Sequence, residues 1–554
     1  MITSFVSIIV LLCAFFWAFY RLPQVFFLND EWTQIGNVFV HGLSAGLHSN
    51  ILMQLTGKYR IIGAFINNLF FYYFPGNALP FIIFGYVFHT INIILAYCLA
   101  KKLTKSNLIA FICAMAIAVP TSGQQALSWL GAVVQTTLSV TLLYMAVLFR
   151  IKSLEDKKTG NSILSFVIAY IAFLIKNSSV FIFPLMIFFP YILKREKINF
   201  LQFLRKYIVY IVLFCSFLLW NIYFLFQFRN FADMATSVQT FFRIAFNSVW
   251  YPFISLSHMV VSQRSFFHMS DLFGTFLYQY LTTAVNKDII VVTLMSDMIS
   301  VFFSFIILAI ILFVYWKMRE RRGVLLFGVL WYVLSFVPMA VYLPERNTAF
   351  MESRYVYYSI LGFGLVFGIC AECVYLELKK RVTTSVSFVF FTGILALFYY
   401  KQIVFVQREV YQNVLYTSDI RFLIFDMNRI IPILPEKPIL YITGDRNFFY
   451  QNNVVPFQYG TGFMTMIAFR THEQIPKELI SELYLSRFLE EGYRELNGKG
   501  YGYFWQKEAL FDLFNKNSSL QTGQVIGLYY YGNERKLVDI TGEIRDEISK
   551  NRRN

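Results

Sequence analysis

The sequence predicts a mainly α-helical, polytopic membrane bundle of about eleven spans, followed by a small C-terminal α+β domain. Two observations lead to this fold class. Of the 554 residues, 57% are hydrophobic and only 14% are charged, whereas soluble domains carry roughly 25% charged residues. The apolar residues also form unbroken runs of membrane-spanning length up to residue 400, and these runs stop in the more polar tail. A soluble enzyme of this size is therefore excluded.

The apolar runs define the order of the spans. The predicted spans cover residues 4–20, 79–100, 108–120, 128–149, 162–175, 178–193, 207–227, 294–316, 323–342, 354–375 and 383–400. A further apolar stretch, 61–74, is short for a span, and we interpret it as a helix that dips into the membrane from outside.

The distribution of basic residues sets the orientation of the bundle. With 61–74 not crossing, five loops that begin near residues 101, 150, 194, 317 and 379 fall on one side and hold 19 Lys and Arg residues. The positive-inside rule places these loops and the N-terminus in the cytoplasm. Residues 1–400 then form the membrane domain, with outer loops at 21–78 and 228–293. We expect an integral multi-pass protein of a bacterial inner membrane.

The net charge of +16 does not indicate a nucleic-acid partner. The first 400 residues hold 29 basic against 14 acidic residues, and the remainder holds 19 against 18. The excess therefore lies in the short loops between spans, which is typical of membrane topology rather than of a phosphate-binding face. The six cysteines all lie in apolar segments, so no disulfide framework is required.

The tail, residues 401–554, predicts an extracytoplasmic α+β domain. Gln402–Ile430 is typical of a helix that leaves the membrane, and Pro438–Thr443 of a strand. Glu473–Leu496 is expected to be helical. Two strands, Gln524–Tyr531 and Arg535–Ile540, are expected to form a hairpin.

An acidic pair, Asp30 and Glu31, opens the first outer loop. A carboxylate at the membrane surface, partly screened by aromatic side chains, has the basicity to take a proton from a hydroxyl group. Asp30 is thus the candidate general base, and Glu31 is expected to orient the acceptor or share that role. The alternative is an ordinary solvated start of a loop.

Basic residues at the outer ends of apolar segments are candidate phosphate ligands. Lys58 and Arg60 head the membrane dip, Lys176 separates two short spans, and Arg354–Tyr355 opens the tenth span. Lys and Arg bind phosphate, and Arg does so bidentately. The alternatives are snorkelling to the interface for Lys58 and Arg60 and an ordinary span end for Arg354.

His89 and Asn92 lie one turn apart in the second span and share a face of the helix. A substrate contact and a helix–helix hydrogen bond are the two interpretations of His89. The sequence contains no phosphate-binding loop, serine-nucleophile motif or zinc-type cluster of Cys and His. The cytoplasmic loops are too short for a nucleotide-binding module, so a lipid-phosphate-linked donor fits better than a free nucleotide sugar.

Five short motifs in order resemble the GT-C superfamily of membrane glycosyltransferases across about residues 20–375. Asp30-Glu31 resembles the first-loop acidic motif of protein O-mannosyltransferases and their bacterial relatives. The other four motifs are similar to stretches of related mannosyltransferases: Arg60 followed by Phe84-Gly85, His89 and Asn92; Pro120–Trp129; Ile175-Lys176-Asn177 up to Pro184; and Arg354-Tyr355-Val356-Tyr357.

The resemblance implies an inverting glycosyltransferase with a polyprenyl-phosphate sugar as donor and a glycan, lipid or protein as acceptor. Where the relatives carry glutamate, this chain has Gln124–Gln125 in the second outer loop and Asn177 after Lys176. A metal site built on those carboxylates is therefore in doubt. We expect metal-independent chemistry without a cofactor, with a divalent cation as the alternative.

Two other functions remain open. A polymerase or ligase of lipid-linked polysaccharides also has about a dozen spans, and it would use arginines of the 228–293 loop. A transporter or flippase would require charges near the middle of the membrane and repeat symmetry, and the sequence shows neither.

Overall fold

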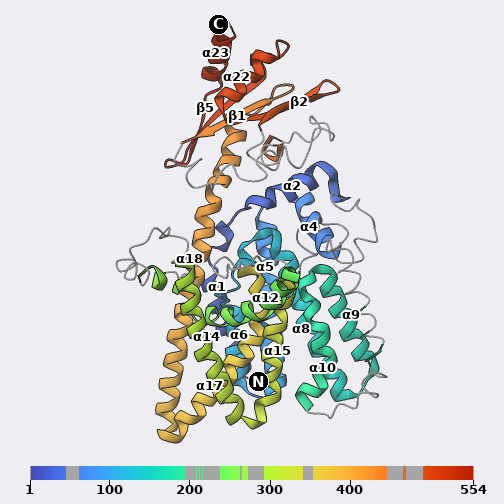
Figure 1. Ribbon diagram of the computed structural model, residues 1–554, viewed down its shortest axis with the longest axis vertical. Helices are drawn as coiled ribbons and strands as arrows, with labels where there is room; N and C mark the ends of the chain where they lie inside the picture. The colour runs from blue at the N-terminus through green and yellow to red at the C-terminus, as the bar shows by residue number, and fades with distance from the viewer. Residues whose placement is uncertain are drawn as a thin grey trace.

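The computed structural model describes residues 2–44, 61–194, 207–208, 211, 215, 238–262, 265–266, 268–272, 292–340, 353–445, 466–469 and 491–552. Within these ranges the chain forms a bundle of long apolar helices, and a five-stranded sheet with its own helices stands at one end of that bundle (Figure 1). The prediction of a mainly helical membrane protein is confirmed at this level.

Among the described residues, seven helical segments are long and apolar enough to cross a membrane. Their main helices are α1 (Ile2–Ala18), α5 (Leu79–Thr104), α8 (Leu130–Asp156), α14 (Val292–Lys317), α15 (Arg322–Ala340), α17 (Ile360–Arg381) and α18 (Thr384–Ile430). Shorter apolar helices are α6 (Asn107–Ala118), α9 (Thr159–Ile175) and α10 (Ile182–Lys194). The span expected at 207–227 lies almost wholly outside the described residues.

The bundle is apolar both on its outer surface and in its packing core, as expected in a bilayer. Phe302, Phe305 and Trp316 of α14 are large apolar side chains that remain exposed. In the interior, α15 and α17 approach so closely that a side chain at Gly362 would meet the backbone oxygen of Gly328. Small residues at such crossings are typical of membrane helices, because these helices associate through close van der Waals packing rather than through the hydrophobic effect.

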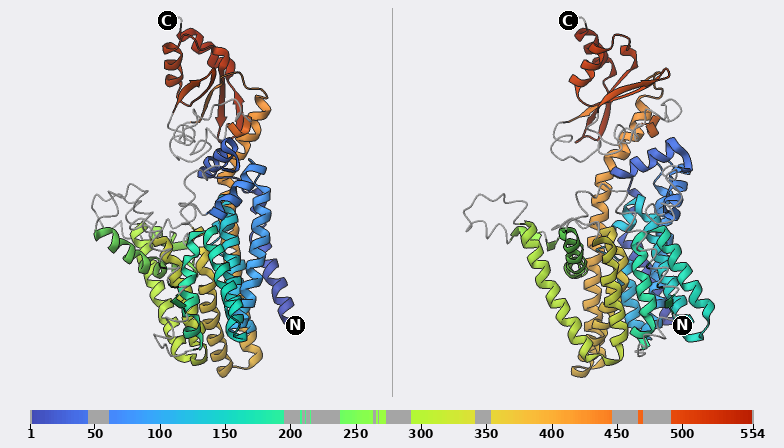
Figure 2. Two further views of the ribbon diagram at one scale, coloured as in Figure 1. Left: turned by 90° about the vertical axis from the view of Figure 1, so that its right-hand side faces the viewer. Right: turned by 45° about the vertical axis from the view of Figure 1, so that its right-hand side comes forward.

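Four of the five predicted basic loops meet at one end of the bundle. The Lys101 ammonium donates to Ser4 Oγ (2.7 Å), and Lys102 pairs with Glu155 (2.8 Å). Lys317 pairs with Glu377 (2.9 Å). We call this region the basic end. The sheet stands beyond the opposite end, as Figures 1 and 2 show.

Helix α18 joins the bundle to the sheet in 47 residues without a break. The domain boundary expected at residue 400 falls inside this helix, and the expected helix at Gln402–Ile430 is its second half. That half is held against the end of α1 and the loop after it, because Gln407 donates to the Trp17 carbonyl (2.9 Å) and Thr417 Oγ1 accepts from the Phe26 amide (3.1 Å).

The short helix expected at 61–74 is present, and a second helix lies within the 228–293 loop. Helix α4 (Ile61–Tyr73) has 13 residues, about 20 Å of helix, which is short of the roughly 30 Å of a bilayer core. Helix α12 (Val238–His258) packs against α14 and α15 and lies across the direction of the long helices (Figure 2). Its exposed residues include Phe242 and Val249, while Tyr251 is buried.

The sheet is mixed, with the strand order β2-β3-β1-β4-β5. Its strands are β1 (Ile439–Gly444), β2 (Gly492–Leu496), β3 (Lys499–Phe504), β4 (Val525–Tyr531) and β5 (Lys536–Asp539). Strand β1 runs parallel to β3 and β4, and the two edge strands are antiparallel to their neighbours. The strand expected at Pro438–Thr443 and the hairpin after Gln524 are confirmed.

One expected element is wrong where the structure describes it. The sequence predicts a helix over Glu473–Leu496, but the last five residues of that range, Gly492–Leu496, form strand β2. Asn497 and Gly498 both have positive φ angles (51° and 76°) and join β2 to β3 as a two-residue hairpin turn. Residues 473–490 lie outside the described ranges.

Both faces of the sheet are covered. Helices α22 (Lys507–Lys516) and α23 (Thr541–Asn551) pack on the face that carries Ile439 and Tyr441. The opposite face, with Leu440 and Ile442, belongs to the same continuous apolar cluster as the bundle. Strand β5 contacts α18, so the sheet packs against the helix that leads to it.

Candidate functional site

The acidic pair lies on α2 (Asn29–His41), at the end of the bundle nearest the sheet (Figure 1). Asp30 and Glu31 stand in the first turn of this helix. Helix α2 packs on α4, and α4 in turn packs on α8 and α9. Helices α2 and α4 therefore cover the sheet-side ends of two bundle helices.

Glu31 is fully buried and bound to the starts of two helices. Its carboxylate accepts from the amide of Leu28, which precedes α2, and from the amide of Gly131 in the first turn of α8. A Cβ on Gly131 would lie 3.1 Å from the carboxylate of Glu31, so the missing side chain is what admits the glutamate. Both amides are groups that a helix start leaves without an internal partner. Glu31 thus fixes the orientation of α2 on α8.

Asn67 of α4 binds the carbonyl of the same residue, Gly131. Its Nδ2 donates to the Gly131 carbonyl at 2.8 Å, and its side chain is only 3% exposed. Its Oδ1 has no hydrogen-bond partner among the residues that the structure describes. One turn earlier, Gly63 lies against the Ile175 carbonyl. Helix α4 therefore lies directly over the sheet-side ends of α8 and α9.

Lys176 lies beneath α4, where α9 ends and the short helix η3 (Asn177–Phe181) begins. Only 3% of Lys176 is exposed. Its ammonium donates to Thr136 Oγ1 of α8 at 2.5 Å and lies 5.8 Å from the ring centre of Tyr358. A buried ammonium is costly unless it is hydrogen-bonded and near opposite charge. This environment supplies hydroxyl and aromatic contacts and keeps the ammonium out of bulk water.

Arg354 stacks on the ring of Trp129, with its guanidinium carbon 3.9 Å from the ring centre. It belongs to the short helix α16 (Ser353–Val356). Tyr355 is also within cation–π range of the guanidinium, at 5.3 Å. Trp129 is the residue directly before α8, so Arg354 is placed at the same helix start as Glu31.

The segment that holds Gln124 and Gln125 is joined to α16 by hydrogen bonds. Gln124 accepts from the hydroxyl of Ser353 through Oε1, and the amide of Gln125 contacts Ser353 Oγ at 3.1 Å. Helix α7 (Gln125–Ser128) follows directly. Gln124 is buried, and it holds the loop and the residue next to Arg354 together.

His89 makes the helix–helix contact that was one of its two interpretations. Its Nδ1 shares a hydrogen bond of 2.7 Å with the hydroxyl of Tyr357, to which Asn92 also donates (3.2 Å). Asn92 donates in addition to the Thr137 carbonyl (3.1 Å) and accepts from the Thr141 hydroxyl (2.7 Å). His89 and Asn92 thus tie Tyr357 to α5, and Asn92 also ties α5 to α8.

Helix α8 is the common scaffold of these groups. Glu31 contacts Gly131, Lys176 contacts Thr136, and Arg354 contacts Trp129. Gly131 and Thr136 are five residues apart, which is about 7.5 Å along a helix axis. The structure therefore brings the start of α2, which carries Glu31, and the cations Lys176 and Arg354 to the first two turns of α8 and the residue before it.

Sequence reasoning missed the scaffold residues Gly131, Thr136 and Tyr358. A signal for them exists, because the fourth predicted span carries Thr136, Thr137, Ser139 and Thr141 within six positions. Hydroxyl side chains in a span commonly bond to neighbouring helices. Ser139 contacts the hydroxyl of Tyr358.

Three expected site residues are not brought into this geometry. Lys58 and Arg60 lie outside the described residues, and Asp30 is described through its backbone alone. Within the described ranges, no group of three or more His, Cys, Asp or Glu side chains is arranged to hold a metal ion. No protein-family model matches the sequence, and the comparison with curated proteins finds no match.

Proposed function

We propose that this protein transfers a sugar from a polyprenyl-phosphate donor to an acceptor hydroxyl of a glycan, lipid or protein, with inversion at the anomeric carbon. The observation that carries the proposal is the shared scaffold: α8 holds the acidic helix start through Gly131 and a buried lysine through Thr136. The displacement requires a base on one side of the anomeric carbon and a ligand for the leaving phosphate on the other, and anchors about 7.5 Å apart along one helix support that arrangement.

In the proposed step, Asp30 takes the proton of the acceptor hydroxyl. The acceptor oxygen bonds to the anomeric carbon while the bond from that carbon to the phosphate oxygen breaks. The bonding pair leaves with the polyprenyl phosphate, whose negative charge grows in the transition state. Lys176 and Arg354 stabilise this charge, Arg60 is expected to assist, and Glu31 holds Asp30 in position.

The burial of Lys176 supports its role. Charges inside a membrane protein are functional candidates because their desolvation is costly. The same low dielectric strengthens the attraction between an ammonium and a phosphate that reaches it. Lys101, Lys102 and Lys317 bind other side chains at the basic end, whereas α2 lies at the opposite end of the bundle (Figure 1).

We propose that the basic end faces the cytoplasm and that the site opens on the other side of a bacterial cell membrane. The donor would then be drawn from the outer leaflet. We further propose that no metal ion is needed, because Gln124, Gln125 and Asn177 stand where related enzymes carry carboxylates. Transfer that persists in excess chelator would support this.

The test uses the purified full chain in proteoliposomes with a radiolabelled polyprenyl-phosphate hexose and membrane extract as acceptor. Lys176→Met is expected to abolish transfer, whereas the matched control Lys380→Met, which removes an exposed lysine at the basic end, is expected to retain it. Addition of single sugars supports the proposal. Long repeating products would instead indicate a polymerase, and solute flux without any donor would indicate a transporter.

A further inference from the structure

A cavity of about 590 Å³ opens at the basic end, away from the candidate site. It lies where α5, α8 and α10 end and α15 begins. Its walls are apolar and include Leu103, Leu154 and Phe189, whereas its rim is charged and includes Lys102 and Arg319. The volume falls in the range of small-molecule sites, about 300–1,000 Å³.

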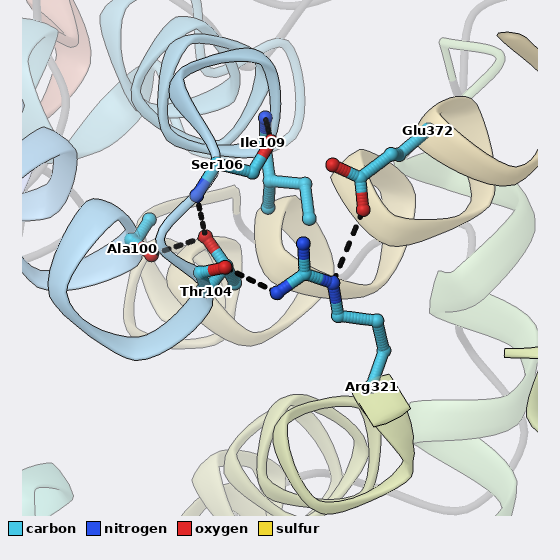
Figure 3. Close-up of polar contacts among 6 residues, drawn as sticks. All are labelled: Ala100, Thr104, Ser106, Ile109, Arg321 and Glu372. Atoms are coloured by element: carbon cyan, nitrogen blue, oxygen red, sulfur yellow. Dashed lines mark hydrogen bonds and ion pairs between the residues drawn. The ribbon is translucent and has the colours of Figure 1, made fainter. Parts of the chain in front are cut away.

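The rim is held in place without a ligand. Arg321 of η5 (Arg319–Arg321) donates to the Thr104 carbonyl at the end of α5 and to the Glu372 carboxylate of α17 (3.2 Å), as Figure 3 shows. Thr104 in turn accepts from the amide of Ser106 (3.2 Å) and donates to the Ala100 carbonyl (2.7 Å). The segment that carries Arg319 is thereby fixed to the segment that carries Lys102, so the cavity is preformed.

The side of the cavity between α10 and α15 is also close-packed. A Cβ on Gly323, at the start of α15, would lie 2.9 Å from the Ile192 carbonyl of α10. The missing side chain allows α10 and α15 to meet below the cavity mouth. The four helix ends that surround the cavity are therefore held in fixed positions by direct contacts.

The charge around the mouth favours an anion. The charged residues that line the cavity are balanced, with Lys102 and Arg319 against Glu155 and Glu320. The positive excess comes from the surrounding segments 101–105, 150–158, 194 and 317–322, which hold twelve Lys and Arg residues against three Asp and Glu residues. At the rim itself, Lys102 pairs with Glu155, and both side chains are partly exposed (33% and 48%). Exposed pairs of this kind are weak, so a phosphate can compete for Lys102. Glu320 also lines the cavity, and an anion would approach from the lysine side.

The combination of apolar walls and a basic rim identifies the class of ligand. Helices α5, α8 and α15 are long and apolar enough to cross a membrane, which places their charged ends at the level of lipid headgroups. Basic pockets between transmembrane helices bind anionic headgroups, and the apolar part of a lipid can enter between the helices. A free phosphate would use the rim and leave the apolar walls uncovered.

We propose that this cavity binds one anionic phospholipid of the adjacent leaflet, with its phosphate between Lys102 and Arg319. The glycerol and the upper acyl chain pack on Leu103, Leu154 and Phe189. This site is independent of the proposed sugar transfer, because it uses none of the residues near α2, η3 or α16.

The test is native mass spectrometry of the purified full chain titrated with phosphatidylglycerol or phosphatidylcholine. We expect one phosphatidylglycerol to be retained more strongly than phosphatidylcholine. The double variant Lys102→Gln/Arg319→Gln is expected to weaken that binding about fivefold per cation, or about 25-fold in total. The control Lys317→Gln/Lys380→Gln removes the same charge from residues that pair with Glu377 outside the cavity, and it is expected to leave the binding unchanged.

A second variant tests the apolar wall of the cavity independently of its charged rim. Leu154→Trp fills the apolar wall and is expected to displace the lipid while leaving the melting temperature of the delipidated protein within a few degrees of the wild type. Equal retention of the two lipids, equal loss in both double variants, or competition by millimolar glycerol phosphate as effective as that by the lipid would overturn the proposal.

Discussion

The carboxylate of Glu31 accepts a hydrogen bond from the backbone amide of Gly131, one hundred residues further along the chain. The same carboxylate accepts from the amide of Leu28. With two amides already bound, Glu31 serves as a positioning residue, and the neighbouring Asp30 remains the proposed base. This division of roles leads to the first prediction.

Replacing Glu31 is expected to affect stability more than chemistry. Glu31→Ala leaves two buried amides without their acceptor, which costs about 1–3 kcal/mol for each group, whereas Glu31→Gln keeps one acceptor oxygen and costs less. The melting temperature in detergent should therefore be highest for the wild type, lower for Glu31→Gln and lowest for Glu31→Ala. A Glu31→Gln protein that retains its melting temperature but loses all transfer would show that Glu31 itself is the base.

Gly131→Ala tests the same contact from the other side. The added Cβ would lie 3.1 Å from the glutamate carboxylate, so the variant is expected to be destabilised. In the double variant Glu31→Gln/Gly131→Ala the two losses should not add, because residues in contact share their interaction energy. Strict additivity of the two changes in melting temperature would contradict the contact.

Thr136→Val removes the hydroxyl that accepts from the Lys176 ammonium with almost no change in shape. We expect a several-fold rise in the KM for the lipid-linked donor and a smaller change in kcat, because the ammonium loses its fixed position but not its charge. Loss of one such bond costs about 1–3 kcal/mol. Steady-state kinetics with the labelled donor measure this, and Thr141→Val, which lies deeper in α8, is the control. An equal effect of both variants would argue against a specific role of Thr136.

Arg354→Lys keeps the charge but loses the planar stack on Trp129. A lysine does not reproduce bidentate or stacked contacts of an arginine. We expect weaker donor binding in Arg354→Lys and a similar defect in Trp129→Leu, measured as the KM for the donor. If Arg354→Lys behaves as wild type, charge alone accounts for the contribution of this residue.

Glu491, directly before β2, predicts a pH dependence of the sheet domain. Burial raises the pKa of its carboxyl above the ordinary value of 4.5, although the amides of Trp505 (2.5 Å) and Gln506 donate to it and oppose the rise. A carboxyl with a raised folded-state pKa stabilises the fold below 4.5 and loses that contribution as the pH rises through the folded value. Glu491→Gln keeps the acceptor, so its melting temperature should not decline in this window. An unchanged decline would assign the effect to other groups.

Glu495 predicts the opposite slope on the acid side. Hydrogen bonds from the Lys437 ammonium and the Tyr493 hydroxyl lower its pKa below 4.5. Its stabilising contribution is present above 4.5 and is lost as the pH falls through the folded value. Lys437→Gln is expected to reduce this acid-side loss, and melting curves on the acid side of 4.5 measure it. The effect is small, because Glu495 is largely exposed.

The sequence predicts those parts of the fold that depend on local pattern. Apolar runs locate the long helices, Pro438–Thr443 locates the central strand, and the loops with Lys102 and Arg321 meet at one end as the positive-inside rule implies. Lys176 and Arg354 were identified because a cation beside a membrane span is energetically costly and is therefore a functional candidate. Each of these inferences uses only near neighbours in the chain.

The contacts that join distant segments were not predictable in this way. No periodicity links Glu31 to Gly131 or Lys176 to Thr136, since each pair is formed by the packing of separate helices. Strand β2 was missed for another reason. The charged residues Arg494 and Glu495 are typical of the exposed face of a helix. The Asn497–Gly498 pair that follows them is a stronger signal, because it predicts a β-hairpin turn, and the structure forms that hairpin.

The central claim is that a carboxylate of the first outer loop and the cations around α8 act together on a lipid-phosphate-linked sugar. Its most direct test is the rate of transfer from a labelled polyprenyl-phosphate hexose by Asp30→Asn protein in proteoliposomes, with donor binding measured on the same sample. The account predicts that transfer falls by at least about 100-fold, as for loss of a general base, while the donor still binds. Transfer at the wild-type rate by the Asp30→Asn protein would contradict it.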